Sequence, residues 1–451
     1  MKIKLYRSST VGIDLGDYKI LTDPWLTDGE YYGSWSHYPY FDIDANLQEL
    51  NTYNAIYISH IHPDHCSENT LKKLDKNIPI LIHKFHSRFL RDKIQRIGFN
   101  KILELENGIK QNLTNECSIT IYAADNCDPE LCYKFTGCAN LNIKGSSQQI
   151  DTLSVIKNKN NTIVNVNDCP YQLAHQTLKI IKNHHKNIDI LLTGYGGAGP
   201  YPQCFDNLSY EEKIIEADKK KLNFLNQALA FIQFLKPKYY LPFAGTYALT
   251  GKLSNKQNIR GVPSLDETYD YLDKKLKLDK RNENINAIKL GPGQFFDLND
   301  ITKSSEYSSI SLKDQQSYID NVLSHKKFDY EEDPYPEKEE ILALSKKAYK
   351  NFIEKKNILN SKINSDIIIN CKGFSVLLPY DKDDIEIKEE NFTSNRKFLK
   401  LTVDIRLLKK ILMGPKYAHW NNAEIGSHIL YYRSPNIFDR NLHLSLCYFH
   451  N

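Results

Sequence analysis

The stretch at residues 59–66, Ser-His-Ile-His-Pro-Asp-His-Cys, decides the fold of this chain. An apolar run precedes it, so the stretch is expected to follow a short buried strand. His60 and His62 alternate along the turn and can face one point, while Asp64 and His65 can face a second point close by. Imidazole and carboxylate groups suit zinc, iron or manganese. Four ligand-type residues in this spacing favour a metal site over a polar loop with chance histidines.

Short apolar runs around this stretch predict the strands of a layered α/β domain. The runs at 12–15 and 19–22 predict a hairpin around Gly16. A Lys- and Glu-rich pattern at 210–235 predicts a long helix that ends before Pro237. Further strands are expected at 55–59, 80–83, 119–123, 162–166, 188–193 and 239–243, and further helices at 69–74 and 171–182.

The sequence divides into three parts. Residues 1–300 are expected to form the α/β domain, 301–335 a Ser- and Asp-rich linker, and 336–451 a small α+β domain. Within the last part, helices are predicted at 337–356 and 406–413 and strands at 367–378 and 398–405.

Composition narrows the class of protein. A net charge of +4 over 451 residues gives no ground for a nucleic-acid partner. The start lacks the apolar stretch of a signal peptide, and no run of about 18 apolar residues occurs, so no membrane span is expected. Nine cysteines without an export signal favour a reduced, cytoplasmic protein. A small-molecule substrate is the expected partner.

The pattern His-x-His-x-Asp-His after a strand resembles the metallo-β-lactamase superfamily. That resemblance implies an αββα sandwich with one or two divalent metal ions, and ligands that continue with a third His, a bridging Asp and a last His. Asp168, which follows the strand at 162–166, matches the bridging position; the alternative is that it caps the next turn. Asp64 and Asp168 are then the expected catalytic carboxylates. The C-terminal part weakly resembles the sterol-carrier-type units attached to some superfamily members.

Two positions depart from the superfamily pattern. No histidine lies at 118–134, where the third ligand is expected, so Asp128 is the first choice for that role and Asp125 the second. The competing interpretation is that Asp128 starts a turn before Pro129. No histidine follows the strand at 239–243 either. One firmly held metal is therefore expected in preference to two equal ones.

Further stretches resemble the β-lactamase-like part of the CMP-N-acetylneuraminate hydroxylase family over roughly residues 10–300. Those hydroxylases carry a Rieske iron–sulfur domain, which needs paired Cys-and-His motifs, and we find no such pairs here. If the chain performs oxygen chemistry, a separate electron-transfer protein or the substrate has to supply the electrons. The matching stretches are 22–27, 56–60, 165–169, 196–200, 218–225 and 241–245.

Several residues are candidates for contact with a substrate. Asp23 and Trp25 lie in a loop that the resemblance places near the metal mouth; Asp23 is equally a candidate for holding a ligand histidine or for a plain turn. The glycine-rich stretch at 194–202 allows close backbone approach to a ligand, with an ordinary tight loop as the even alternative. The glycines and aromatic residue assigned to substrate contact are Gly196, Gly197, Gly199 and Tyr247.

Other clusters are interpreted conservatively. Cys127, Cys132 and Cys138 have spacings that fit no standard zinc or iron–sulfur knuckle, so buried thiols are favoured over a metal site. His419 is taken as a structural or substrate-lid residue and not as a ligand.

Three functions are compatible with these residues. Two histidines and a carboxylate on one metal are the ligand set of non-haem iron oxygenases, which favours an iron-dependent hydroxylase of a polar sugar- or nucleotide-containing substrate. The second hypothesis is a metal-dependent hydrolase, which zinc would favour, in which a metal-bound hydroxide attacks a phosphoester, ester or amide. The third, a binding protein that has lost its metals, fits poorly with an intact ligand motif.

Overall fold

The computed structural model describes residues 1–136, 141–358 and 363–451. Its first sheet has eight strands in the order β17-β16-β1-β2-β3-β5-β6-β7. Neighbouring strands from β17 to β3 in this order are antiparallel, and β3, β5, β6 and β7 run parallel. Their bounds are β1 Lys2–Arg7, β2 Thr10–Asp14, β3 Lys19–Thr22, β5 Ala55–Tyr57, β6 Ile80–His83, β7 Ile102–Leu105, β16 Phe295–Asp297 and β17 Thr302–Lys303.

The second sheet has seven strands in the order β15-β13-β12-β11-β10-β9-β8. Strands β11, β12, β13 and β15 run parallel, and β8, β9 and β10 are antiparallel to their neighbours. Their bounds are β8 Lys110–Asn112, β9 Ser118–Ala123, β10 Thr152–Lys157, β11 Thr162–Asn165, β12 Ile190–Gly194, β13 Tyr239–Phe243 and β15 Asn286–Ala287.

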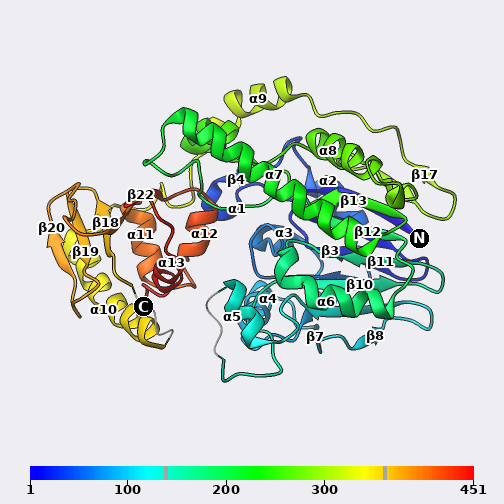
Figure 1. Cartoon of the computed structure of the whole chain (residues 1–451), viewed down its shortest axis with the longest axis horizontal. Helices are drawn as coiled ribbons and strands as arrows, with labels where there is room; N and C mark the ends of the chain where they lie inside the picture. The colour runs from blue at the N-terminus through cyan, green and yellow to red at the C-terminus, as the bar shows by residue number, and fades with distance from the viewer. Residues whose placement is uncertain (137–140, 359–362) are drawn as a thin grey trace.

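The inner faces of the two sheets pack on each other. One cluster of buried side chains joins Ile3, Ile13 and Leu81 of the first sheet to Ile119 and Leu192 of the second. Because side chains alternate along a strand, the other faces must be covered separately. Helices α2 (Ile43–Leu50), α3 (Glu68–Lys73) and α4 (Phe89–Ile97) cover the first sheet, and α6 (Tyr171–His184), α7 (Tyr210–Leu235) and α8 (Leu265–Lys277) cover the second (Figure 1). The αββα sandwich is confirmed.

Most predicted elements lie where the apolar runs placed them. Strands β3, β6 and β13 and helix α7 have the predicted bounds. The run at 367–378 is not one strand, because Gly373 (φ 86°) turns the chain and divides it into β18 (Asp366–Cys371) and β19 (Phe374–Leu378). The predicted linker at 301–335 includes strand β17, helix α9 (Leu312–Asn321) and the 3-10 helix η3 (Leu323–His325).

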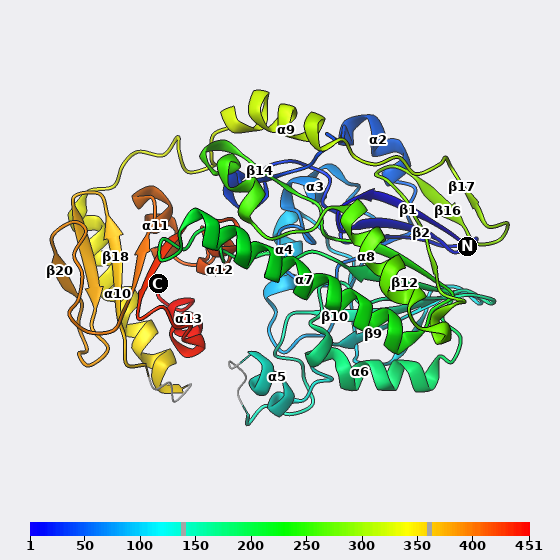
Figure 2. The ribbon, with the colours of Figure 1, turned by 45° about the horizontal axis from the view of Figure 1, so that its top comes forward.

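The C-terminal part forms an α+β unit around a five-stranded sheet in the order β20-β19-β18-β21-β22. Figure 2 shows this unit beside the sandwich, with helix α12 of the unit on the side that faces the sandwich. Its core is continuous with Trp25, Trp35 and Tyr247 of the sandwich. The remaining elements of the unit are α10 Lys338–Ile358, β20 Glu386–Lys388, β21 Phe398–Thr402, α11 Ile405–Leu412, α12 Trp420–Ile425, β22 Leu430–Ser434 and α13 Arg440–Leu446.

Short elements connect the two parts. Helix α1 (Glu30–Gly33) contacts α12, and β4 (Trp35–Ser36) pairs with β14 (Ala248–Leu249). The other short elements are α5 (Pro129–Thr136) and the 3-10 helices η1 (Gly251–Ile259) and η2 (Lys280–Asn282). Within the part of the chain that the structure describes, no helix has the length and apolar character needed to cross a bilayer.

His428 at this junction makes stability depend on pH. Its Nδ1 lies 3.0 Å from the Tyr330 hydroxyl and its Nε2 lies 2.7 Å from the Tyr31 carbonyl. Burial lowers the pKa of His428 from 6.5 to about 4. Between these two values the unfolded chain takes up a proton that the folded chain does not, so the free energy of unfolding falls as the pH falls.

We expect this histidine to contribute a slope of about 1.4 kcal/mol per pH unit in that window. Urea unfolding at several pH values between 4 and 7 measures the slope. The variant His428→Gln should flatten it, whereas the exposed His184→Gln should leave it unchanged. Equal slopes for all three proteins would contradict the assignment.

Candidate metal centre

The candidate site lies where parallel strands of both sheets end. Asp23 follows β3, Ser59 and His60 follow β5, and Asp168 follows β11. Asn167 before it has a left-handed backbone (φ 52°), and Gly194 provides the space, since a Cβ at Gly194 would meet the Asn167 carbonyl oxygen at 3.0 Å. The carboxyl ends of parallel strands are the usual location of α/β active sites.

His60, His65 and Asp168 come together at this point, with one ligand-type atom of each within 4.8 Å of the others. His65 Nε2 lies 3.2 Å from Asp168 Oδ2 and 3.5 Å from Asp64 Oδ2. His62 joins from the other side, with Nδ1 at 3.0 Å from His60 Nε2. The five residues of the predicted set are therefore close together in the folded chain.

Each histidine has a further polar neighbour, which for His60 and His62 is a hydrogen-bond partner that determines which ring nitrogen carries the hydrogen. Ser59 Oγ donates to Asp23 Oδ2 and therefore accepts from His60 Nδ1, at 2.9 Å. His65 Nδ1 lies 3.2 Å from Asp23 Oδ2. His62 Nε2 lies 3.1 Å from Oδ1 of Asn421, in the C-terminal unit.

These partners leave His60 Nε2 and His62 Nδ1 as unprotonated nitrogens that face each other. Two lone pairs at the 3.0 Å separation of His60 and His62 repel each other unless a cation lies beside them. Among the described residues, neither ring nitrogen of His65 nor Asp168 Oδ1 makes a well-aligned hydrogen bond, although all three atoms are buried. The donor atoms therefore fit a divalent metal ion, with imidazole and carboxylate ligands.

Within the cluster, burial and neighbouring charges shift the pKa values of different groups in opposite directions. Burial and the neighbouring His65 and His62 lower the pKa of His60. Burial works against ionisation of Asp64, but His65 and His62 lower its pKa to about 2. The pKa of His65 is raised, because the charges of Asp168 and Asp64 outweigh the effect of burial.

Asp128 does not face this cluster. Its Oδ1 accepts from the backbone N–H of Glu130 at 2.9 Å, at the start of α5. This is the turn before Pro129 that was the competing interpretation, and it corrects the choice of Asp128 as third ligand. Asp125 is buried, and its Oδ1 accepts from the backbone N–H of Cys127 at 3.0 Å.

Asp151 is a carboxylate that the sequence analysis missed. It precedes β10, whose Thr152 Oγ1 donates to the Ser59 carbonyl at 2.8 Å, beside the histidine stretch. Burial and the charge of Asp168 raise the pKa of Asp151 to about 7. Its only signal in the sequence is its position before an apolar run, which is too common to identify a ligand.

Tyr31 was also missed. Its hydroxyl donates a short hydrogen bond to Asp64 Oδ1. Tyr31 and Tyr32 have left-handed backbones (φ 52° and 60°), which are strained for residues other than glycine. Nothing in the local sequence predicts this conformation.

The residues assigned to substrate contact have other positions. Asp23 and Trp25 have no exposed surface, which does not fit contact with a substrate. Asp23 instead holds His65 and Ser59, which was its alternative role. Gly197 packs under Phe224, and a Cβ there would lie 2.3 Å from the ring. Gly199 has φ 110° with no atom within 4 Å of an added Cβ, so of the three assigned glycines it is the one with free space around it.

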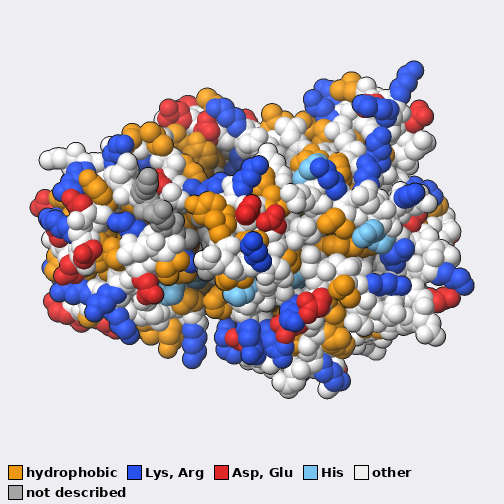
Figure 3. Space-filling model, turned by 60° about the horizontal axis from the view of Figure 1, so that its bottom comes forward, with side chains coloured by type: hydrophobic (Ala, Val, Ile, Leu, Met, Phe, Trp, Pro, Cys, Tyr) orange, Lys and Arg blue, Asp and Glu red, His pale blue; other side chains and the backbone are white. Residues whose placement is uncertain are grey.

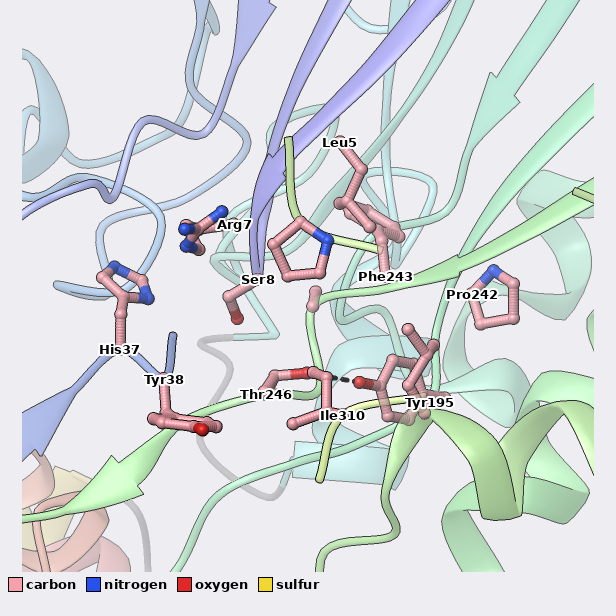
Figure 4. Close-up of a pocket in the computed structure, with 13 residues that line it drawn as sticks. Leu5, Arg7, Ser8, His37, Tyr38, Tyr195, Pro242, Phe243, Thr246 and Ile310 are labelled. Carbon is pink, nitrogen blue, oxygen red and sulfur yellow. Dashed lines mark hydrogen bonds between the residues drawn. The ribbon is translucent and has the colours of Figure 1, made fainter. Parts of the chain in front are cut away.

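Tyr247 lies at the edge of the site. It is buried, stacks on Trp35 with ring centroids 3.5 Å apart, and contacts the Arg260 guanidinium. The loop before it, Ala244-Gly245-Thr246, provides no nitrogen ligand. Figure 4 shows the Thr246 hydroxyl bonded to the Tyr195 hydroxyl in a small pocket beside this loop.

Among the described residues, His60, His65 and Asp168 form the one group of candidate metal ligands. Cys127 is half-buried and Cys132 is buried, and Cys138 lies outside the described residues. His419 caps α12 and is not in the ligand cluster. On the face in Figure 3, Lys, Arg, Asp, Glu and hydrophobic side chains are interspersed.

Comparison with known families gives a match to the Beta-lactamase superfamily domain over residues 2–244. The cytidine monophosphate-N-acetylneuraminic acid hydroxylase of Danio rerio is 28% identical over 246 residues, which cover 51% of this chain and 36% of that protein. A putative Rieske 2Fe-2S iron-sulfur protein of Mycobacterium tuberculosis is 24% identical over 230 residues, covering 50% and 40%. The chain thus spans little more than a third of the length of the fish hydroxylase.

Solved structures with a similar arrangement include isothiocyanate hydrolase from Delia radicum gut bacteria, with a TM-score of 0.43, 14% identity and coverage of 66% of this chain and 99% of that chain. CmlA, a diiron beta-hydroxylase from Streptomyces venezuelae, has a TM-score of 0.38, 13% identity and coverage of 64% and 52%.

The position of Gly196 provides a test of the site's architecture. A Cβ at Gly196 would lie 2.7 Å from the Gly245 Cα, so two loops at the strand ends touch through their backbones. We expect Gly196→Ala to destabilise the protein by about 1–3 kcal/mol, because neither backbone can move freely. At Gly291 the nearest atom would be 3.5 Å away, so Gly291→Ala is the matched control, with a change within about 0.5 kcal/mol. Urea unfolding compares the two, and equal stabilities would contradict the predicted contact.

Proposed function

We propose that this chain, which belongs to the metallo-β-lactamase superfamily of metal-dependent enzymes, is an iron-dependent hydroxylase of a polar sugar- or nucleotide-containing small molecule. The observation that carries the proposal is the donor set. His60, His65 and Asp168 supply two imidazoles and one carboxylate, and the superfamily's later histidine positions are filled by other residues. Two histidines and one carboxylate with open positions suit non-haem iron(II).

The chain's own residues would hold and orient the ion. His60, His65 and Asp168 would hold the iron, with His62 and Asp64 beside them as the proposed further ligands of the centre. The bound iron would supply activation of O2. Asp64 and Asp168 are the proposed catalytic carboxylates because both side chains are partly exposed, 14% and 29%. Substrate would therefore approach from their side, while Ser59 and Asp23 hold the buried histidines from behind.

Hydroxylation of a C–H bond by O2 yields C–OH and one water, and it consumes two electrons and two protons. We propose that a separate electron-transfer protein supplies the electrons. The names of two relatives support this assignment, one a hydroxylase and the other a putative Rieske protein.

The hydroxylase and the hydrolase hypotheses differ in their metal and in their need for oxygen. We expect protein reconstituted anaerobically to retain iron(II) and to consume O2 when given a chemical reductant and a cytidine monophosphate sugar, with a product 16 mass units heavier. Oxygen electrode and mass spectrometry measure this. Turnover with zinc under anaerobic conditions would instead establish a hydrolase.

The histidine stretch should be needed for metal binding and not for folding. We expect His60→Ala to lose most of its bound metal while its Tm changes by only a few degrees, because apolar layers and not the ion form the core. Metal analysis and thermal unfolding measure both effects. The exposed His184→Ala is the control and should keep its metal. A His60→Ala protein with full metal content would contradict the ligand assignment.

Asp151 is our proposal for the ligand position that a third histidine normally fills, since the next residue, Thr152, donates to the Ser59 carbonyl beside His60 and the charge of Asp151 interacts with that of Asp168. We expect Asp151→Asn to weaken iron(II) binding about 10-fold or more. Asp128→Asn is the matched control and should keep wild-type affinity, because Asp128 caps α5. Chelator competition measures both. The reverse order of affinities would restore Asp128 as the ligand.

A further inference from the structure

We propose that the C-terminal unit completes the metal centre, with Asn421 as the residue that positions His62. This inference rests on the proposed metal site. It adds Asn421, which lies outside the superfamily match because that match ends at residue 244. Asn421 and His62 are 359 residues apart in the sequence, and their side chains lie 3.1 Å apart.

The chemistry of the contact determines the tautomer of His62. Asn421 Oδ1 is an acceptor only, so His62 Nε2 must carry the hydrogen and Nδ1 keeps its lone pair. That lone pair faces His60 Nε2 at 3.0 Å. Without Asn421 the hydrogen is free to move to Nδ1, where it would block the nitrogen that faces the site. Partners of this kind orient ligand imidazoles and raise their basicity.

Asn421 is itself held by its neighbours in and around α12. Its backbone N–H donates to His419 Nδ1 at 3.1 Å, and the His419 N–H donates to the Tyr32 hydroxyl at 2.8 Å. Trp420 is buried, and its Nε1 donates to the Phe449 carbonyl at 2.8 Å. The side chain of Asn421 therefore projects from a segment anchored in the core of the C-terminal unit.

The same unit holds a second ligand through Tyr31. His428 Nε2 lies 2.7 Å from the Tyr31 carbonyl, and the Tyr31 hydroxyl donates to Asp64. The left-handed backbones of Tyr31 and Tyr32 are costly, by about 1–3 kcal/mol each, and persist only where surrounding contacts enforce them. Two of the five proposed ligands thus depend on contacts that the C-terminal unit makes.

The ligand histidines receive their second contacts from two different parts of the chain. Ser59 and Asp23 hold His60 and His65 from within the sandwich, whereas His62 has its partner across the junction. The metal centre is therefore a composite of the two parts, and the sandwich alone would leave one histidine without its orienting partner.

The test uses the full chain and cobalt(II), whose visible absorption reports ligand geometry. We compare wild type, Asn421→Leu, Asn421→Ser and Asn421→Asp. Leucine has a similar volume without an acceptor, serine is too short to reach His62, and aspartate keeps an Oδ acceptor. The exposed Asn395→Ala is the control from the same unit.

We expect Asn421→Leu and Asn421→Ser to weaken cobalt binding about 10- to 100-fold and to alter its absorption bands, while Asn421→Asp and Asn395→Ala stay within a few-fold of wild type. Thermal unfolding of the metal-free proteins separates this from loss of fold. If Asn421→Leu fails to fold, Asn421→Ser still provides the comparison.

Unchanged affinity and absorption in a folded Asn421→Leu or Asn421→Ser protein would overturn the proposal, as would a lower Tm without any change in cobalt binding. Failure of the metal site itself has a different signature. In that case wild type would bind no cobalt, or His60→Ala would bind it equally well.

Discussion

A buried carboxylate ties the two sheets together at the point where the site forms. Asp23 has no exposed surface and accepts from Ser59 N at 2.7 Å, Ser59 Oγ at 3.0 Å and Asn167 Nδ2 at 2.7 Å, with His65 Nδ1 at 3.2 Å. A buried charge is tolerated only when donors surround it, and removing one of its partners costs about 3–5 kcal/mol. Ser59 follows a strand of the first sheet and Asn167 follows a strand of the second. The hydrogen bonds that both donate to Asp23 therefore also fix the distance between the two sheets at this edge.

That constraint explains why the ligands converge. Asn167 immediately precedes Asp168, and Ser59 immediately precedes His60, so the hydrogen bonds to Asp23 place both candidate ligands from the two sheets. Lys93 holds the far part of the histidine stretch by donating to the Ile61 and Cys66 carbonyls at 3.2 Å and 2.9 Å. The backbone of the stretch is thus held at both ends before any ion binds, which favours a preorganised site.

The sequence predicts the parts of this arrangement that are local. The metal ligands could be predicted because strand ends align at one sheet edge. The signals are the spacing of His60, His62, Asp64 and His65 within one turn, and the position of Asp168 after an apolar run. Asp128 was misassigned because the sequence around it fits two roles. It is a carboxylate near the expected ligand position, and an Asp before Pro-Glu also commonly caps a helix. The fold shows that Asp128 caps the helix. The run at 367–378 was read as one strand because its apolar residues continue on both sides of the Gly373 turn.

Asn421 and Tyr31 could not be predicted, and the reason is physical. Their roles come from contacts across 359 and 33 residues of sequence, respectively, made by side chains whose types are common in loops. A histidine needs a second partner to fix its tautomer, but the sequence does not say which element provides it. Ser59 and Asp23 contact His60 and His65, but the partly buried Nε2 of His62 still requires an acceptor. Among the described hydrogen bonds, that acceptor is Asn421 of the C-terminal unit and not a loop of the sandwich. The docking of the C-terminal unit answers that requirement, so the junction between the two parts and the geometry of the metal centre are one structural problem.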